Sequence, residues 1–458
     1  MMNLTYGVKD KPGFGKTLVF AFQQLLAILA ATIAVPAIIG NGMSQSAALF
    51  GAGMGTLVYL CFTKFKSPVF LGSSFAFISS MFVAFAGGVS MSVGYVGLLI
   101  GAVFAGLVYV IIALIVKVAG VKWIAKLMPA VVIGPTVSII GLSLAGNAVK
   151  DAVGCSAGFI EYDAANSVYN MGAKGWLALI CAVVTLFTVM LCSVYGKKMT
   201  KLIPFIIGIL AGYVIAAILT VIGISTGNET LQIIDFSRFN DMQWIPDFTF
   251  LKAINGNVNL GDLGSWGAYI GTIAVAYVPV AFVVFAEHIA DHKNLSSIIG
   301  TELLEEPGLH RTLLGDGIGS MVGAIFGGCP NTTYGESIGC VAITGNASVV
   351  TILTTAILCI VASFVAPFTT FLATIPSCVM GGVCITLYGF IAVSGLKMIQ
   401  AVDLGDNRNL FVVATVLITG IGGMALQIGK VKLTAIAVAL ILGIIANLIL
   451  SGKDKKEQ

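Results

Sequence analysis

Residues 330–339 read Pro-Asn-Thr-Thr-Tyr-Gly-Glu-Ser-Ile-Gly, in the middle of a chain that is otherwise strongly apolar. Pro lacks a backbone N–H, Gly loosens the backbone, and Asn, Thr and Ser side chains compete for backbone hydrogen bonds, so this stretch makes a poor transmembrane helix. Non-helical backbone at membrane depth persists only where it is buried in protein or lines a cavity. An ionisable group there, here Glu336, is costly and is by default a functional candidate. The stretch therefore predicts a polar binding site near the middle of a membrane.

The composition identifies the class of protein. Hydrophobic residues make up 58% of the chain and charged residues only 10%, whereas about a quarter of a soluble domain is charged. This indicates an all-α polytopic membrane protein with lipid around it. The 55 glycines favour closely packed and broken helices. The formal net charge of +4 gives no indication of a nucleic-acid partner, because the Lys and Arg residues sit in short loops, where they report topology.

Other function classes find little support in the sequence. The nine cysteines are scattered singly and there are three histidines, so neither a metal site nor a disulfide framework is expected. No nucleophile and base stand at a credible spacing for an enzyme, and no organic cofactor is expected. The first sixteen residues are short and polar without a cleavable signal pattern, so the first span is expected to act as its own insertion signal.

A span needs about 20 apolar residues. By that measure the sequence predicts fourteen segments, near 17–39, 46–63, 68–86, 93–118, 128–146, 175–194, 201–224, 268–290, 312–328, 331–345, 349–370, 374–396, 409–427 and 432–450. The third and the tenth are weak because each opens with a polar, Gly-rich stretch. Lys and Arg concentrate in the loops after even-numbered segments and in the tail, which places those loops and both termini in the cytoplasm. Lys430 and Lys432 conflict with this assignment, since they fall in a predicted outer loop.

The chain also reads as two halves, 1–225 and 226–458. Pro129 lies five residues before Gly134, and Pro376 lies five residues before Gly381, each at the start of the fifth segment of its half. Seven segments per half is an odd number, so the second half must insert with the opposite orientation. Paired Gly- or Pro-interrupted segments in inverted repeats point at a transporter's substrate site. Chance similarity of Gly-rich apolar sequence is the alternative.

Two more acidic residues lie in the second half. Glu287 follows an apolar run near the end of the eighth segment, and in an inverted repeat it can face the same cavity as Glu336. A carboxylate accepts from a ligand N–H when ionised and donates to a carbonyl when protonated, which suits a flat heterocycle with alternating N–H and C=O groups. Asp291 lies four residues after Glu287 and would share its helix face, so this pair could carry a transported proton. The alternative is that Asp291 and His292 begin a solvated loop.

Backbone groups are candidates too. A half-helix leaves N–H groups unpaired at its beginning, and two such ends near Phe75 and Gly335 would present donors to ligand carbonyls. Tyr334 could stack on a planar ligand or orient the neighbouring carboxylate. Ordinary packing is the alternative for Phe75.

Four motifs carry a resemblance to a known family. The chain is similar to the nucleobase–cation symporter 2 family, also called nucleobase–ascorbate transporters, and in particular to its bacterial uracil permeases. The resemblance covers essentially the whole chain and rests on residues 71–78 (Leu-Gly-Ser-Ser-Phe-Ala-Phe-Ile), 286–289 (Ala-Glu-His-Ile), 307–311 (Pro-Gly-Leu-His-Arg), and 330–339 with 342–344 (Ala-Ile-Thr). The Asn-Thr-Thr-Tyr-Gly-Glu form is the one that uracil members carry.

The resemblance implies fourteen segments in two inverted repeats, with short strands in segments 3 and 10. It implies a core domain, about 17–118 plus 268–370, and a gate domain, about 128–224 plus 374–450, that also supplies a homodimer interface. The function implied is proton-coupled import of uracil across the cytoplasmic membrane by an elevator-like movement of core against gate.

Carried over by residue, the resemblance implies that Glu287 and Glu336 hydrogen-bond the nucleobase, that the Phe75 and Gly335 N–H groups meet its carbonyls, and that Glu287 is the main proton-coupling group. Three positions depart from the pattern: Gln24 stands where the family often has His, Asp291 stands where the uracil pattern has His, and Gly345 stands where Arg is common in the family. Asp at position 291 is familiar from purine transporters, so xanthine or another purine remains an alternative substrate. An anion transporter sharing the fold is a further alternative, which the acidic site groups disfavour.

Overall fold

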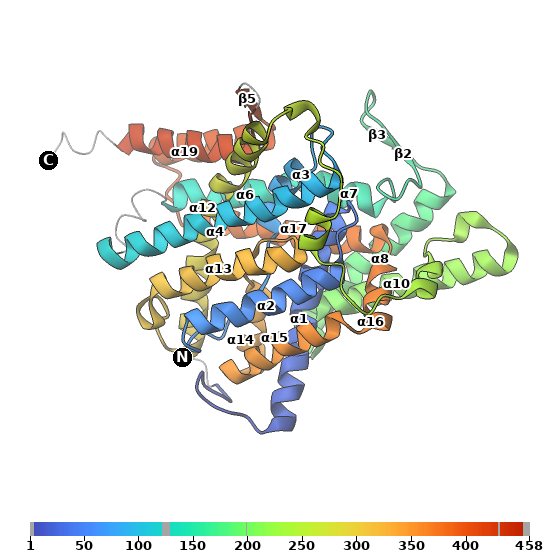
Figure 1. The fold of residues 1–458 in the computed structure, drawn as a ribbon, viewed down its shortest axis with the longest axis horizontal. Coiled ribbons are helices and arrows are strands. Elements are labelled where there is room, and N and C mark those ends of the chain that lie inside the picture. Colours follow the sequence, from blue (N-terminus) through green and yellow to red (C-terminus); the bar gives the residue numbers. More distant parts are fainter. Residues whose placement is uncertain (1–3, 121–128, 198, 429–430, 452–458) are drawn as a thin grey trace.

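The computed structural model describes residues 4–120, 129–197, 199–428 and 431–451, and it is mostly helical (Figure 1). The first half contains α1 (Phe14–Ile39), α2 (Gln45–Phe62), β1 (Leu71–Ser73), η1 (Phe75–Phe77), α3 (Ile78–Ala84), α4 (Met91–Ala119), α6 (Ala130–Ser143), α7 (Ala145–Ala152), β2 (Glu161–Asp163), β3 (Val168–Asn170), α8 (Ala173–Tyr195), α9 (Met199–Leu202) and α10 (Pro204–Thr226).

The second half follows a connection that holds η2 (Glu229–Leu231), η3 (Phe236–Asp241), α11 (Thr249–Ile254) and η4 (Gly261–Leu263). It contains α12 (Trp266–Ile299), η5 (Leu304–Gly308), α13 (Leu309–Gly327), β4 (Asn331–Thr333), α14 (Gly335–Thr344), α15 (Val349–Ser363), α16 (Ala366–Ala373), α17 (Ser377–Gln400), α18 (Asn407–Ile421), β5 (Leu426–Ile428), β6 (Val431–Leu433) and α19 (Ala435–Ser451).

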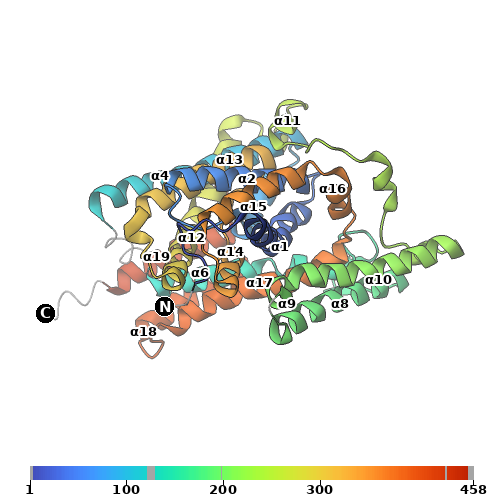
Figure 2. The same ribbon diagram turned by 90° about the horizontal axis from the view of Figure 1, so that it is seen from below.

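The helices form two layers with other helices between them (Figure 2). In one layer α2 packs on α13 and α15, and α13 packs on α4. In the other layer α17 packs on α6 and α8, α8 packs on α10, and α18 packs on α6 and α19. The helices α1 and α12 touch members of both layers. Each layer therefore combines helices from both halves of the chain.

Glycines allow the close approach between helices. A Cβ added at Gly141 would lie 2.4 Å from the Tyr388 carbonyl oxygen, and one added at Gly395 would lie 2.3 Å from the Ser138 nitrogen, so α6 and α17 touch backbone to backbone. Pro129 and Pro376, which echo each other in the sequence, are the N-cap residues of these same two helices. This arrangement is compatible with an inverted repeat, and the repeat itself stays a prediction.

Two short strands far apart in the sequence pair with each other inside the molecule. β1 and β4 are antiparallel, with Leu71 opposite Thr333 and Ser73 opposite Asn331. Hydrogen bonds from Ser74 N to Pro330 O (2.9 Å) and from Tyr334 N to Phe70 O (3.2 Å) extend the pairing. These are the strands predicted in the third and tenth segments, and their pairing brings the two polar stretches side by side.

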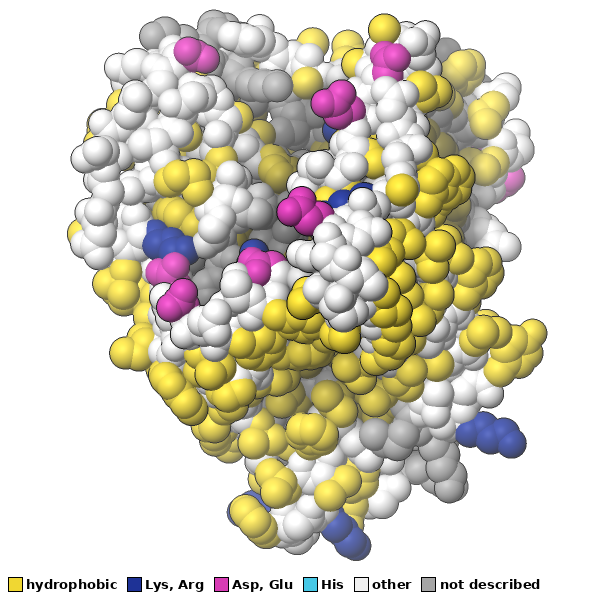
Figure 3. Space-filling model, turned by 90° about the vertical axis from the view of Figure 1, so that its right-hand side faces the viewer, with side chains coloured by type: hydrophobic (Ala, Val, Ile, Leu, Met, Phe, Trp, Pro, Cys, Tyr) yellow, Lys and Arg dark blue, Asp and Glu magenta, His cyan; other side chains and the backbone are white. Residues whose placement is uncertain are grey.

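Apolar side chains face outward along the long helices. On α4 the exposed residues Val103, Leu107, Ile111 and Leu114 recur every three or four positions, which places them on one helix face. Helices α8 and α10 carry similar exposed stripes. In Figure 3, hydrophobic side chains cover the lower half of the view and acidic side chains stand in the upper half. A surface of this kind fits a bilayer with loops in water on either side.

The predicted segments correspond to these elements, with two differences. Within the described residues eight helices are long and apolar enough to cross a membrane, or nine if α15 and α16, which meet at 81°, form one bent span. The count of fourteen therefore stays a prediction. The eighth segment was predicted to end at residue 290, which is wrong, because α12 continues without a break to Ile299. Lys430 lies outside the described residues.

Candidate functional site

One cavity collects the side chains that the sequence singled out. Its volume is about 430 Å³, and its lining includes Phe75, Glu287, Asp291, Tyr334, Gly335 and Glu336. We call it the carboxylate cavity. Its size lies within the range of about 300–1,000 Å³ that is typical of small-molecule sites. Residues up to 261 positions apart in the chain thus meet in one place.

The walls of the carboxylate cavity come from elements between the layers and from the layer that holds α6, α10 and α17. The β1–β4 ribbon, with the helices that follow its strands, forms one wall, and α12 supplies Val283, Glu287 and Asp291. The opposite wall is largely apolar and comes from α6, α10 and α17. Its residues are Val137, Ile140, Phe205, Leu387, Phe390, Ile391, Ser394 and Met398. The cavity is therefore polar on one side and apolar on the other, as expected of a site for a flat, partly polar molecule.

Helix beginnings present backbone donors to the carboxylate cavity. The first hydrogen bond of α14 runs from Ile338 N to Tyr334 O (3.2 Å), so the N–H groups of the residues before Ile338, beginning with Gly335, have no intrahelical acceptor. The same holds for Phe75, because the η1–α3 helix begins there. A Cβ added at Gly335 would meet nothing within 4 Å, so open space lies beside that backbone. Both predicted backbone donors thus stand at a cavity wall.

Three carboxylates face this space. Glu336 lies in the first turn of α14, where the positive end of the helix dipole favours a negative charge. Glu287 is exposed although it lies on a helix packed on several sides. Asp291 is partly exposed, and its Oδ2 accepts a hydrogen bond from Thr333 Oγ1 (2.7 Å). The alternative in which Asp291 and His292 begin a solvated loop is wrong, since both lie inside α12 and His292 is buried.

Tyr334 contacts the protein more than the cavity. Its side chain is 3% exposed, its hydroxyl donates to Ser73 O (2.8 Å), and its ring occupies the space that a Cβ on Gly72 would need, with a closest approach of 2.3 Å. These contacts hold β1 and β4 together. They account for a glycine at position 72 and an aromatic residue at position 334 without a contact between the ring and a ligand.

Gln24 supports the beginning of α14 from α1. Its amide nitrogen donates to both the hydroxyl and the carbonyl oxygen of Ser337, the residue after Glu336. The Ser337 hydroxyl also accepts from Phe70 N (3.1 Å) at the start of the ribbon. Gln24 therefore occupies the place of the family's His as a buried hydrogen-bond donor to the site's supporting layer.

Behind the carboxylate cavity lies a buried polar cluster that the sequence did not reveal. His288 Nδ1 lies 2.6 Å from Asp316 Oδ2 and its Nε2 lies 3.0 Å from Thr312 Oγ1, joining α12 to α13. His292 Nε2 lies 2.6 Å from the Tyr59 hydroxyl, and its ring stacks on His288 with centroids 4.0 Å apart. Buried polar groups of this kind hold a helix in one position when they are satisfied. The cluster anchors the face of α12 next to the one that carries Glu287 and Asp291, and within it Asp316 Oδ1 has no partner among the described residues.

Sequence reasoning missed Thr333, Gln24 as a donor, and this cluster. Thr333 stood inside the quoted stretch without a role, and only the fold shows that its hydroxyl reaches α12. The partners of His288, Asp316 and Thr312, lie in α13. From the sequence, that segment is identified only by its apolar character, and its polar residues received no role. Within the described residues, no group of three or more His, Cys, Asp or Glu side chains could hold a metal ion.

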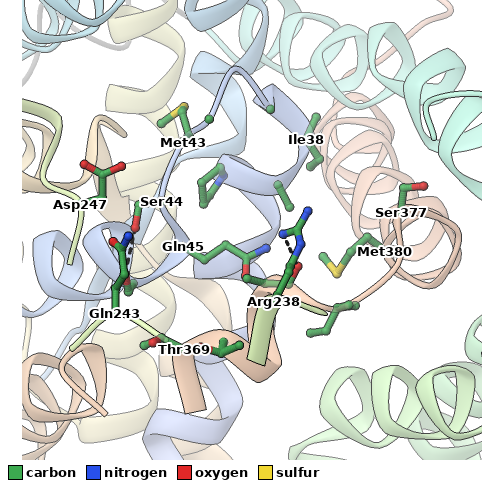
Figure 4. Close-up of a pocket in the computed structure, with 18 of the residues that line it drawn as sticks. Ile38, Met43, Ser44, Gln45, Arg238, Gln243, Asp247, Thr369, Ser377 and Met380 are labelled. Carbon is green, nitrogen blue, oxygen red and sulfur yellow. Dashed lines mark hydrogen bonds between the residues drawn. The ribbon is translucent and has the colours of Figure 1, made fainter. Parts of the chain in front are cut away.

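A second cavity, of about 780 Å³, lies beside the first turn of α17 (Figure 4). Its lining includes Met380, Gln45 and Arg238, and the Arg238 Nη1 donates to Ala373 O (2.7 Å). It contains none of the predicted site residues. Because α17 lines the carboxylate cavity from Leu387 to Met398, the two cavities lie along opposite ends of this helix.

Comparisons with known proteins identify the family of the chain. The sequence model of the Permease family matches residues 15–429. The chain is 38% identical over 453 residues to a uracil permease of Bacillus caldolyticus, covering 98% of this chain and 95% of that protein. It is 37% identical to a uracil permease of Bacillus subtilis (99% and 96% covered) and 32% identical to one of Escherichia coli K12 (98% and 94% covered).

Solved structures show the fold. The transmembrane domain of the cyanobacterial bicarbonate transporter BicA superposes with a TM-score of 0.64 at 16% identity, covering 94% of this chain and 96% of that chain. Murine Slc26a9, an anion transporter, superposes with a TM-score of 0.63 at 13% identity, covering 97% and 69%. At such low identity the likeness concerns the fold alone. The matched family model and the relatives together establish that this chain belongs to the permease family of nucleobase–cation symporters, the nucleobase–cation symporter 2 family.

Proposed function

We propose that this protein is a proton-coupled symporter that imports uracil, with the carboxylate cavity as its substrate site. The observation that carries the proposal is the meeting of Glu287 and Glu336 with two helix beginnings, at Phe75 and Gly335, around one cavity. Relatives that match nearly the whole chain are named uracil permeases.

The chemistry of the cavity matches the chemistry of the ring. Uracil carries N–H donors and C=O acceptors on the edge of a flat heterocycle. Ionised carboxylates only accept hydrogen bonds, and backbone N–H groups only donate them. Glu287 and Glu336 then bind the ring N–H groups, and the N–H groups of Phe75 and Gly335 bind its carbonyls. The apolar residues Phe205, Leu387 and Phe390 cover the ring faces.

The anion-transporter alternative fits this cavity less well. BicA, a bicarbonate transporter, and Slc26a9, an anion transporter, share the fold. The cavity of this chain collects Glu287, Asp291 and Glu336, and an ionised carboxylate repels an anion over such short distances. A neutral nucleobase meets no such penalty.

Proton coupling is assigned to Glu287, with Asp291 one helical turn away. Residues four apart on a helix are neighbours, so the protonation of one carboxylate affects the other. Asp291 is held by Thr333, whereas the described residues offer the Glu287 side chain no hydrogen bond and it is exposed to the cavity. Glu287 is thus the group that both a ligand and a proton from water can reach.

The proposed transport step is an elevator-like movement of the core domain, 17–118 plus 268–370, against the gate domain, 128–224 plus 374–450. Its support is the placement of the carboxylate cavity between two layers, with apolar side chains on the gate wall. By the predicted topology α17 runs from the outside at Ser377 to the cytoplasm at Gln400. The carboxylate cavity then lies toward the cytoplasm and the second cavity toward the outside. The inverted repeats, the homodimer and the cytoplasmic position of both termini belong to the same proposal.

The proposal is tested by uptake of labelled uracil into proteoliposomes at two external pH values, with a panel of unlabelled nucleobases as competitors. Saturable uracil uptake that rises at the lower external pH supports it. Transport of xanthine or hypoxanthine without uracil uptake would overturn the substrate and would favour the purine alternative that Asp291 suggests. Uptake of bicarbonate instead of any nucleobase would overturn the function altogether.

A further inference from the structure

We infer that Thr333 is a positioning residue, which fixes the carboxylate of Asp291 and holds α12 against the β4–α14 segment so that Glu287 and Glu336 stay together on the polar side of the cavity. This inference rests on the proposed function. It assigns a role to a side chain that the family resemblance leaves without one.

The first observation is the hydrogen bond itself. Thr333 Oγ1 donates to Asp291 Oδ2 over 2.7 Å. A hydroxyl donor to a carboxylate is a charge-assisted bond, shorter and stronger than a bond between neutral groups. With Oδ2 bound to Thr333, the Asp291 carboxylate is held in one orientation one helical turn from Glu287.

The second observation is where Thr333 stands. It is the last residue of β4, and it pairs with Leu71 across the ribbon. Two residues later α14 begins at Gly335, and Glu336 follows. On the other side Asp291 lies one turn from Glu287 on α12. The Thr333 hydroxyl therefore joins the wall that carries Glu336 to the wall that carries Glu287.

The third observation is burial. Thr333 is 1% exposed, so its side chain is fixed by packing and its methyl group fills space beside the ribbon. The neighbouring Thr332 hydroxyl has no hydrogen-bond partner among the described residues, so hydroxyl bonding is a specific property of position 333. A valine at 333 keeps the shape and removes the donor, whereas a serine keeps the donor and removes the methyl group.

The test measures uracil binding by calorimetry on the purified full-length chain in detergent. Thr333→Val is expected to weaken binding by on the order of tenfold, as for the loss of one hydrogen bond to a charged group, and Thr333→Ser is expected to stay within about threefold of the parent. Thr354→Val is the matched control, because the Thr354 hydroxyl bonds only to Val350 O in its own helix, α15. It is expected to bind as the parent does.

A double-mutant comparison separates positioning from direct contact. If Thr333 acts through Asp291, Thr333→Val has little further effect once Asp291→Ala has removed the acceptor. Parent-like binding by Thr333→Val, equal losses in the Val and Ser variants, or a full additional loss in the Asp291→Ala background would each overturn the inference. If Asp291→Ala binds too weakly to measure, the Val and Ser variants decide. A parent protein that binds no nucleobase would overturn the proposed function, and the inference with it.

Discussion

Glu336→Gln removes one negative charge from the carboxylate cavity while keeping the length and shape of the side chain. The described residues give the Glu336 side chain no ion-pair partner, and the hydrogen bond that its carboxylate accepts from its own backbone N–H can be kept by the amide oxygen of glutamine. Glu336 is one of three neighbouring acidic residues, and the other two are Glu287 and Asp291. The substitution therefore lowers the repulsion within this group. The substitution is therefore expected to change the melting temperature little, because the relief of repulsion between the acidic groups opposes the loss of the favourable charge at the beginning of α14.

Binding is expected to suffer, because the carboxylate is the proposed acceptor for a ring N–H. A hydrogen bond to a charged group contributes about 1.5–3 kcal/mol, and each 1.4 kcal/mol corresponds to about a tenfold change in Kd. The Kd for uracil is thus predicted to rise by about 10- to 150-fold. The glutamine amide adds to this loss when its NH₂ group faces the ring N–H, since two donors then oppose each other.

The assay is calorimetric titration of uracil into detergent-purified parent and variant, with a thermal unfolding scan of each. Glu302→Gln is the control, because Glu302 is an exposed residue in the connection after α12. A Glu336→Gln protein that melts normally and binds uracil as tightly as the parent would refute the role of Glu336. A protein that unfolds at a much lower temperature would refute the argument that no structural contact is lost.

Three other substitutions test separate parts of the site. Glu287→Gln is expected to remove the dependence of uracil uptake on external pH, measured in proteoliposomes; an unchanged pH profile would move proton coupling to Asp291 or another group. Gly72→Ala places a methyl group 2.3 Å from the Tyr334 ring and is expected to destabilise the protein by about 1–3 kcal/mol, measured as a lower melting temperature. Gly339→Ala is its control and should melt as the parent does, because a Cβ at Gly339 meets nothing within 4 Å. Gly335→Ala adds a methyl group in open space and is expected to weaken uracil binding without lowering the melting temperature; unchanged binding would argue against a ligand at this backbone.

Glu287 and Glu336 could be predicted from the sequence because a carboxylate within an apolar, membrane-spanning segment costs free energy, and such a position is visible in the sequence alone. Glu336 lies in a helix-breaking stretch and Glu287 follows an apolar run, and an ionisable residue in either place is a candidate for a functional role. The polar openings of segments 3 and 10 marked both as weak spans, and the strands that pair there as β1 and β4 were implied by the family resemblance. Local chemistry thus predicted residues that the fold brings to one cavity, and their role in binding a substrate stays a proposal.

The sequence could not predict contacts that depend on how helices pack. The run Asp291-His292-Lys293 resembles the start of a loop, but Tyr59 and the carbonyl of His288 satisfy His292 inside the molecule, and α12 therefore continues. The Thr333–Asp291 bond and the ring of Tyr334 against Gly72 join distant segments in the same way. The tertiary structure decides which residues form these contacts, and no periodic pattern in the sequence indicates them.

The most direct test of the account is a structure of the protein with uracil bound, determined by electron cryomicroscopy in a lipid nanodisc. The account predicts ring density in the carboxylate cavity, with ring nitrogens within hydrogen-bond distance of Glu287 and Glu336 and ring carbonyls facing the N–H groups of Phe75 and Gly335. Ring density in the second cavity beside Arg238, with the carboxylate cavity holding only water, would contradict it.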